Sequence, residues 1–147
     1  EVVAEGSDIA LVGLGAMFEV AEKTKALLEA KGYSVTLINP RWIKPLDKET
    51  IERFARQSKV VCTFEDHVLH NGFGCGVIEH LHDAGLKTPV ARVGWPDEFV
   101  EHGSIPALRA KHGLTPEAAV KKILSHLGDS AATAGSEDKT TLSPALS

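Results

Sequence analysis

DIALVGLGAM, residues 8–17, joins a short and almost wholly apolar run to two glycines and then to the start of a helical pattern. A continuous apolar run of this length is typical of a β-strand that is covered on both faces. From Met17 to Lys31, apolar residues recur every three or four positions, and the pattern ends at Gly32. The stretch therefore predicts a strand followed by a helix that packs back onto the sheet.

The same alternation continues along the chain and decides the fold class. Further strands are expected at residues 34–38, 59–64 and 90–93. Further helices are expected after Asp47, which can cap a helix that includes Ile51 and Phe54, and at 74–84, 104–111 and 116–127, the last capped by Thr115. This rhythm predicts an α/β fold, a three-layer α/β/α sandwich with right-handed crossovers. The leading run at residues 1–4 is joined to the next strand by a tight turn alone, so we expect it to be an antiparallel edge strand.

Composition limits the class of protein. The chain has 147 residues, 43% hydrophobic and 24% charged, with a net charge of -4, which fits one globular domain with its own core and gives no basic surface for nucleic acid. No run is long and apolar enough for a membrane span, and no signal segment is visible, so we expect a cytoplasmic protein with Cys62 and Cys75 as reduced thiols.

We assign residues 1–127 to one domain and the small, polar residues 128–147 to a flexible tail. Because the only methionine, Met17, lies within a helical pattern, we expect the chain to be part of a longer protein.

NPRWIKPLD, residues 39–47, follows a predicted strand end, where open α/β sheets gather their ligands. Arg41 stands between two prolines, and its planar guanidinium suits a phosphate or a carboxylate. A second interpretation is that Arg41 pairs with Glu65 or Asp66 and only holds this edge of the sheet together. The residues alone leave both interpretations open.

Glu65, Asp66 and His67 form a second polar cluster at a predicted strand end, followed by glycines that enter a helix. Two acids beside a histidine are groups that carry out acid–base chemistry. The alternative is structural, with the acids capping the helix or binding Arg41 and the glycines permitting close packing. The three residues are therefore possible active-site rim residues.

Gly13-x-Gly15-x-x-Phe18 after the first strand is a weak match to a dinucleotide fingerprint. The third glycine is replaced by Phe18, and Asn39 stands where an acid would bind the ribose. Arg41 can in principle meet a 2′-phosphate, so an NADP-binding Rossmann-like domain remains an alternative.

Five stretches together resemble one known family: DIALVGLGAM, NPRWIKPLD, VCTFEDHVLHNGFGCGV, GWPDEFVEHGS and LRAKHGLTPEAAVKKIL. In this order they resemble the C-terminal domain of the transketolase family of thiamine-diphosphate enzymes. Within that family they are most similar to the synthase branch, which makes 1-deoxy-D-xylulose 5-phosphate from pyruvate and D-glyceraldehyde 3-phosphate with loss of CO₂. Asn71 departs from the pattern, because many relatives have glycine there.

The resemblance implies a five-stranded mixed sheet and a parent enzyme several times longer. Thiamine diphosphate and Mg²⁺ would be bound by preceding domains, with no cofactor, metal or catalytic residue in this chain and no activity of the chain alone. The resemblance also implies that Arg41 helps bind the phosphate of glyceraldehyde 3-phosphate, that the full enzyme is a homodimer, and that its product feeds isoprenoid, thiamine and pyridoxal synthesis. A rival from another class is the subunit-docking domain of a 2-oxoacid dehydrogenase β-subunit.

Overall fold

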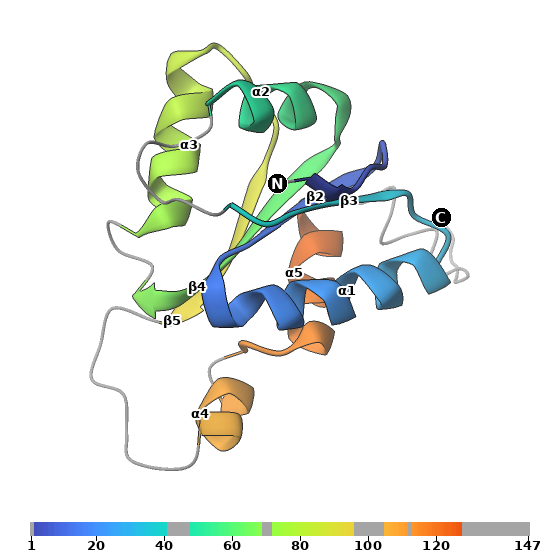
Figure 1. The fold of residues 1–147 in the computed structure, drawn as a ribbon, viewed down its shortest axis with the longest axis vertical. Helices are drawn as coiled ribbons and strands as arrows, with labels where there is room; N and C mark the ends of the chain where they lie inside the picture. Colours follow the sequence, from blue (N-terminus) through green and yellow to red (C-terminus); the bar gives the residue numbers. More distant parts are fainter. Residues whose placement is uncertain (1, 41–47, 69–71, 96–104, 112, 128–147) are drawn as a thin grey trace, which may run out of the picture.

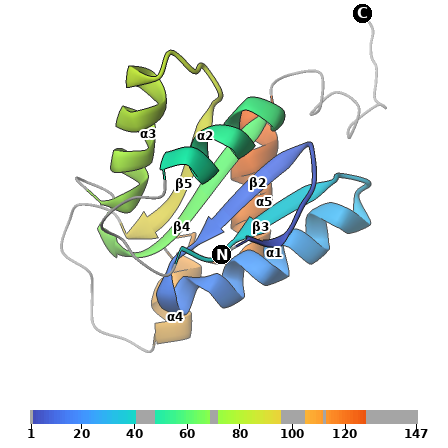
Figure 2. The ribbon, with the colours of Figure 1, turned by 45° about the horizontal axis from the view of Figure 1, so that its top comes forward.

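The structure, a computed structural model, describes residues 2–40, 48–68, 72–95, 105–111 and 113–127. Five strands form one sheet in the order β1-β3-β2-β4-β5 (Figure 2). All neighbouring pairs are parallel except β1 with β3, which is antiparallel. The predicted mixed sheet with an antiparallel first edge strand is therefore confirmed. The strands are β1 (Val2–Ala4), β2 (Ile9–Gly13), β3 (Val35–Ile38), β4 (Val60–Val68) and β5 (Val90–Trp95).

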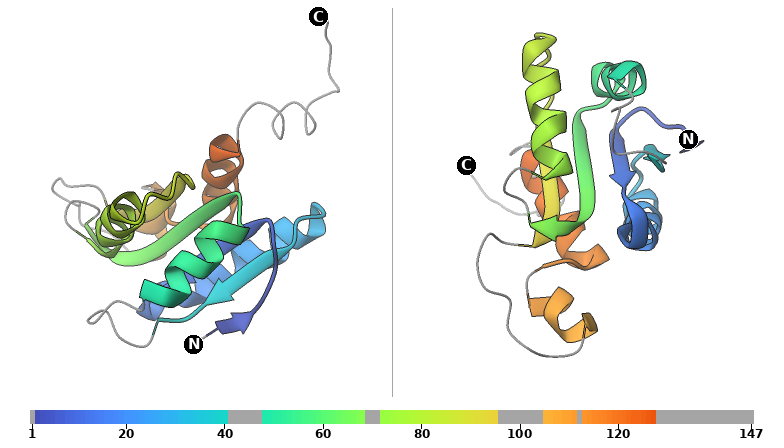
Figure 3. Two further views of the ribbon diagram at one scale, coloured as in Figure 1. Left: turned by 90° about the horizontal axis from the view of Figure 1, so that it is seen from above. Right: turned by 60° about the vertical axis from the view of Figure 1, so that its left-hand side comes forward.

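Helices cover both faces of this sheet and make the predicted three layers. In Figure 1, α2 and α3 lie above the sheet, and α1 and α5 lie below it. Seen from above, α2 and α3 are in front of the strands and α1 is behind them (Figure 3, left). The helices are α1 (Phe18–Ala30), which a short 3-10 helix η1 (Gly15–Met17) precedes, α2 (Lys48–Gln57), α3 (Phe73–Asp83), α4 (Ile105–Lys111) and α5 (Pro116–His126).

The core consists of two apolar clusters, one on each face of the sheet. The cluster under α1 and α5 includes Leu11, Leu28 and Ile123, and the cluster under α2 and α3 includes Phe54 and Val77. Alternate residues of β2 and β4 belong to opposite clusters, because successive side chains of a strand point to opposite faces. The apolar stripe expected on α1 is buried except for Leu27, which is 37% exposed.

Two helix ends follow their sequence signals closely. Gly32 has φ +95°, which L-residues rarely adopt, and its N–H donates to the Glu29 carbonyl in the last turn of α1 at 2.9 Å. Thr115 caps the start of α5, and its Oγ1 accepts a hydrogen bond from the Ala118 N–H at 3.2 Å. The predicted end of α1 at Gly32 and the predicted cap of α5 at Thr115 are therefore confirmed.

Strand β4 is longer than predicted. We expected it to end at Phe64, but it continues to Val68 and pairs with Trp95 of β5 after a register shift. Of the polar residues in this extension, Glu65 and Asp66 form hydrogen bonds with neighbouring elements, as described below. The extension carries β4 to the edge of the sheet where the predicted site lies.

The last described helix, α5, ends at His126, and the tail at 128–147 lies outside the described residues. The assignment of residues 1–127 as one domain stays a prediction. In the part of the chain that the structure describes, no helix combines the length and the apolar content needed to cross a bilayer.

Candidate functional site

The parallel strands β2, β3, β4 and β5 end at one edge of the sheet, which we call the carboxyl edge. Gly13 pairs with Phe64, Val12 with Ile38, and Val68 with Trp95. The Leu14 N–H donates to the Phe64 carbonyl at 2.9 Å and joins β2 to β4 just beyond the end of β2. Figure 1 shows the ends of β4 and β5 side by side. The sheet therefore brings Asn39, Glu65, Asp66 and Trp95 to the same edge, as expected for a ligand-binding α/β fold.

Glu65 lies inside the protein and contacts the start of α3. Its side chain has no exposed surface, and its two carboxylate oxygens accept hydrogen bonds from the N–H groups of Phe73 at 2.7 Å and Gly74 at 2.8 Å. An anion at this place is favoured, because the first N–H groups of a helix have no partner within the helix and carry partial positive charge. Of the two interpretations of Glu65, the geometry favours the capping of a helix.

Asp66, the next residue, is exposed and points to a different element. Its Oδ1 accepts a hydrogen bond from the indole Nε1–H of Trp95 at 2.6 Å, so it links β4 to β5. His67 belongs to β4 by its backbone, while its side chain lies outside the described part of the structure. The sequence did not predict the role of Trp95, because no local pattern indicates a contact with Asp66, 29 positions earlier in the chain.

Gly74 allows α3 to approach the sheet closely. A Cβ atom at this position would lie 2.7 Å from Thr63 Oγ1 and 2.9 Å from Arg92 Cδ. The Nη1 of Arg92 then reaches the sulfur of Cys75 in the first turn of α3, at 3.2 Å. Gly74 thus permits close strand–helix packing, which was the structural alternative weighed from the sequence, whereas a Cβ at Gly76 would meet no atom within 4 Å.

Arg41, the predicted phosphate ligand, belongs to residues 41–47, which lie outside the described residues. Its role stays a prediction. The described residues on either side of this stretch are Pro40, after β3, and Lys48, at the start of α2.

The two glycines of the weak dinucleotide fingerprint have local structural roles. A Cβ at Gly13 would lie 2.9 Å from both the Cβ of Ala21 and the Cα of Phe18, so this glycine lets α1 approach the strand. Gly15 has φ +59°, a left-handed conformation that glycine adopts without strain. Neither glycine therefore needs a nucleotide to explain it.

Cysteine, histidine and acidic side chains are the groups that commonly react or bind metal ions. Both thiols are free, and burial raises the pKa of Cys62 far above its ordinary value, although Lys122 acts in the opposite direction. Within the described ranges, no group of three or more His, Cys, Asp or Glu side chains lies close enough together to hold a metal ion.

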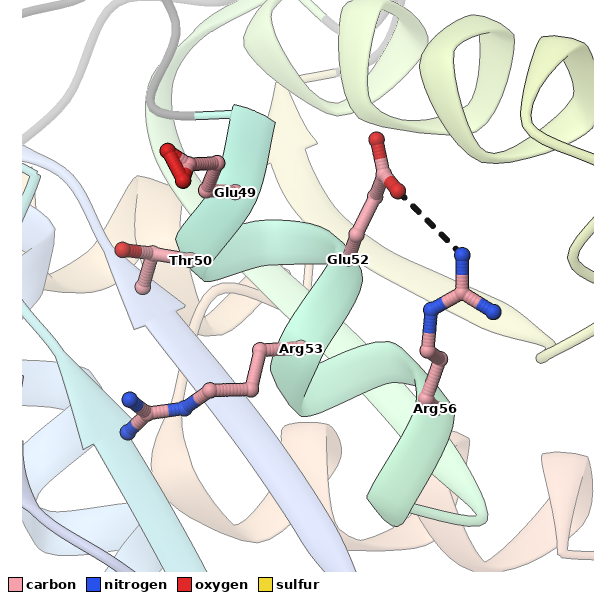
Figure 4. Close-up of a pocket in the computed structure, with 5 residues that line it drawn as sticks. All are labelled: Glu49, Thr50, Glu52, Arg53 and Arg56. Atoms are coloured by element: carbon pink, nitrogen blue, oxygen red, sulfur yellow. Dashed lines mark hydrogen bonds and ion pairs between the residues drawn. The ribbon is translucent and has the colours of Figure 1, made fainter.

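A surface hollow lies along the outer side of α2 (Figure 4). It is lined by Glu49, Thr50, Glu52, Arg53 and Arg56. Three of its charged side chains are paired: Glu52 accepts from Arg56 at 3.3 Å and lies 2.7 Å from His80 Nε2, and Arg53 donates to Glu5, outside the hollow, at 3.1 Å. We assign no ligand to this hollow.

The sequence and the fold are similar to those of known proteins. The family described as "Transketolase, C-terminal domain" matches residues 1–119. The 1-deoxy-D-xylulose-5-phosphate synthase of Acidobacterium capsulatum is 46% identical over 131 residues, which are 89% of this chain and 21% of that protein. The synthase of Methylacidiphilum infernorum is 47% identical over 129 residues, 86% of this chain and 20% of that protein. The chain therefore spans about a fifth of the length of these curated relatives.

Solved structures of transketolases are also similar to this chain in fold. One titled "Split gene transketolase, inactive beta4 tetramer" has a TM-score of 0.80 and 33% identity, and the match covers 86% of this chain and 41% of that one. A transketolase from Pichia stipitis in complex with sedoheptulose 7-phosphate has a TM-score of 0.64 at 16% identity, over 92% of this chain and 18% of that one. The second likeness concerns the fold alone.

Proposed function

Because the chain belongs to the transketolase C-terminal domain family, we propose that it is the C-terminal domain of a 1-deoxy-D-xylulose-5-phosphate synthase. The observation that carries this proposal is the difference in identity among its relatives. The two synthases are 46% and 47% identical to this chain, whereas the split-gene transketolase is 33% identical. The complete enzyme would condense pyruvate with D-glyceraldehyde 3-phosphate with loss of CO₂, for isoprenoid, thiamine and pyridoxal synthesis in the cytoplasm.

In this proposal, preceding domains of the same polypeptide hold thiamine diphosphate and Mg²⁺. The cofactor, when bound there, supplies the chemistry that decarboxylates pyruvate and transfers its two-carbon fragment. The present domain completes a homodimeric assembly, and its carboxyl edge faces the end of the active site that takes the acceptor aldehyde. By itself the chain would have no synthase activity.

Arg41 would bind the acceptor phosphate from this edge. A guanidinium can donate two parallel hydrogen bonds to a phosphate, and this would orient the aldehyde for reaction. In the complete enzyme we expect Arg41→Ala to raise the KM for glyceraldehyde 3-phosphate by about tenfold to a hundredfold, which corresponds to about 1.5–3 kcal/mol for a charged hydrogen bond. The KM for pyruvate should change little, and equal changes for both substrates would count against the phosphate role.

Substrate dependence tests the function itself. The complete polypeptide, supplied with thiamine diphosphate and Mg²⁺, should release CO₂ from pyruvate and form the five-carbon product only when glyceraldehyde 3-phosphate is present. The isolated chain is the matched control and should be inactive.

Other outcomes of that assay would support other functions. Turnover with a ketose phosphate as donor in place of pyruvate would indicate a transketolase. Absence of synthase turnover, together with binding to an acyltransferase core, would indicate a 2-oxoacid dehydrogenase subunit. Micromolar NADP affinity in a calorimetric titration would favour the dinucleotide-binding alternative.

A further inference from the structure

Two neighbouring acids at the end of β4 bind two different elements. The buried carboxylate of Glu65 accepts from the N–H groups of Phe73 and Gly74 in α3, at 2.7 and 2.8 Å. The exposed carboxylate of Asp66 accepts from the indole of Trp95 in β5, at 2.6 Å. Successive side chains of a strand point to opposite faces, so Glu65 reaches α3 on one face, while Asp66 reaches the indole of Trp95 on β5, the neighbouring strand of the same sheet. We call these five residues the edge clamp.

Because Glu65 is buried, its carboxylate oxygens need hydrogen-bond partners within the protein. A carboxylate without exposed surface is strongly unfavourable unless its oxygens are hydrogen-bonded. Here each oxygen receives one N–H from the first turn of a helix, where the helix dipole also favours an anion. The directional bonds therefore fix the start of α3 relative to the end of β4.

The fit of Gly74 shows that this spacing is tight. Its Cα faces Thr63 Oγ1 and the stem of Arg92, with room for hydrogen alone, since a Cβ would lie 2.7 and 2.9 Å from them. A larger residue would push the first turn of α3 outward and lengthen the hydrogen bonds to Glu65. Helix and strand can meet at this distance because position 74 is glycine.

We infer that Glu65 is a positioning residue, which fixes the first turn of α3 and the end of β4 at the carboxyl edge and exchanges no proton with substrate. An acid or base must come within hydrogen-bond reach of the proton it transfers, and both oxygens of Glu65 are already used within the protein. The inference rests on the proposed function for the claim that this edge lies at the acceptor end of the active site. It assigns Glu65 a different task from the acid–base role considered from the sequence.

The test compares Glu65→Gln with Glu79→Gln in the complete enzyme. Glutamine keeps the shape of the side chain but turns one acceptor oxygen into an amide NH₂ that faces an N–H. Glu79 is exposed on the same helix, so its variant removes one charge from α3 and leaves the clamp intact. If Glu65→Gln does not fold, Gly74→Ala disturbs the same two hydrogen bonds from the side of the helix.

Hydrogen exchange is the first measurement. We expect the peptide that contains Phe73 and Gly74 to exchange at least about tenfold faster in Glu65→Gln, since an amide that loses a charged hydrogen bond loses protection. Peptides from α1 and α5 should exchange as in the wild type, and so should every peptide of Glu79→Gln. Unchanged exchange at 73–74 would overturn the inference, whatever reaction the enzyme catalyses.

Kinetics give the second measurement. We expect kcat/KM for the acceptor aldehyde to fall about tenfold in Glu65→Gln, with the KM for pyruvate and the shape of the pH–rate profile unchanged. Loss of one limb of that profile would indicate a proton-transfer role and overturn the inference. Faster exchange with unchanged kinetics would overturn the positioning role. A wild-type enzyme without synthase turnover would overturn the proposed function, while the exchange result would still decide whether Glu65 fixes α3.

Discussion

On one face of the sheet, α1 and α5 are held mainly by apolar packing, with one hydrogen bond from Lys122 Nζ of α5 to the Arg92 carbonyl of β5 at 2.6 Å. On the other face, several hydrogen bonds hold α2 and α3 as well. Below the sheet, Leu28 and Ile123 are fully buried in the larger apolar cluster. Above it, a smaller cluster is supplemented by hydrogen bonds that fix α3 to β4 and α2 to its neighbours. Apolar burial has no preferred direction, whereas a hydrogen bond weakens steeply when its angle or length changes. The lower layer therefore accounts for much of the stability, and the upper layer sets the position of the carboxyl edge.

The largest effect on stability is expected from a cavity in the lower layer. Ile123→Ala removes a fully buried side chain from between α5 and the sheet and should lower the free energy of unfolding by about 2–5 kcal/mol. Ile123→Val, the matched control, should lower it by about 0.5–1.5 kcal/mol. Denaturant unfolding of this chain measures both values. A loss below about 1 kcal/mol for the alanine variant would contradict the importance of this layer.

The next effect concerns two glycines of α3 that differ only in their surroundings. Gly74→Ala places a methyl group against Thr63 and Arg92 and should destabilise the fold by about 1–3 kcal/mol through overpacking. Gly76→Ala meets no atom within 4 Å and should stabilise it by about 0.5–1 kcal/mol, because alanine favours the helix. Thermal unfolding of the two variants gives the sign of each change. Equal signs would mean that α3 does not approach the sheet closely at Gly74.

A smaller effect is expected where α2 meets α3. His80 Nε2 lies 2.7 Å from Glu52 Oε2, and only 15% of the His80 side chain is exposed. His80→Ala should lower stability by about 1 kcal/mol, the value of one hydrogen bond. His82→Ala, an exposed histidine two positions along the same helix, should change it by less than about 0.5 kcal/mol. If the two variants are equally stable, the contact contributes nothing to holding α2.

The two cysteines differ in burial, and chemical labelling of the wild-type protein can compare them without altering the packing. Cys62 belongs to the buried cluster under α1 and α5, and burial raises its pKa above the ordinary value of 9.0. It should therefore stay a neutral thiol and resist alkylation in the native protein, while the partly exposed Cys75 reacts. Mass spectrometry after brief labelling, with Cys75→Ser as control, should find one modified thiol in the wild type and none in the variant.

The raised pKa of Cys62 also predicts how the stability of the fold depends on pH. The unfolded chain can ionise Cys62 near its ordinary pKa of 9.0, and the folded chain cannot. The contribution of this thiol to stability is therefore fully present below pH 9 and is lost as the pH rises above it. Cys62→Ala should reduce the fall in stability measured between neutral and alkaline pH, and an unaltered pH dependence would count against the burial effect.

Much of this fold could be predicted from local sequence signals. The period of apolar residues gave the order of strands and helices, Gly32 and Thr115 marked helix ends, and the tight turn at residues 5–7 predicted the antiparallel edge strand. The predicted end of β4 at Phe64 was wrong, because Glu65 stays in the strand as a buried carboxylate that accepts hydrogen bonds from α3. Its partners are the N–H groups of residues eight and nine positions away, and such a contact exists only once α3 has packed.

The candidate site could be predicted in part. The sequence placed Glu65, Asp66 and His67 at one edge of the sheet, and it left open whether the acids react or cap a helix. The task of each acid depends on the direction in which its side chain points, and this separates Glu65 from Asp66 although they are adjacent. Trp95 and His80 had no signal, because the sequence does not encode contacts between distant elements in any local pattern. Arg41 remains a prediction from the family resemblance.

One measurement compares the two layers most directly. It is the value of kcat/KM for glyceraldehyde 3-phosphate in the complete enzyme, determined for Gly74→Ala and Ile123→Val at a temperature at which both variants are fully folded. We expect Gly74→Ala to lower this value about tenfold, equivalent to about 1.4 kcal/mol of transition-state stabilisation, and Ile123→Val to leave it within about twofold. Equal losses in both variants, or a larger loss in Ile123→Val, would contradict the assignment of the carboxyl edge to the layer of α2 and α3.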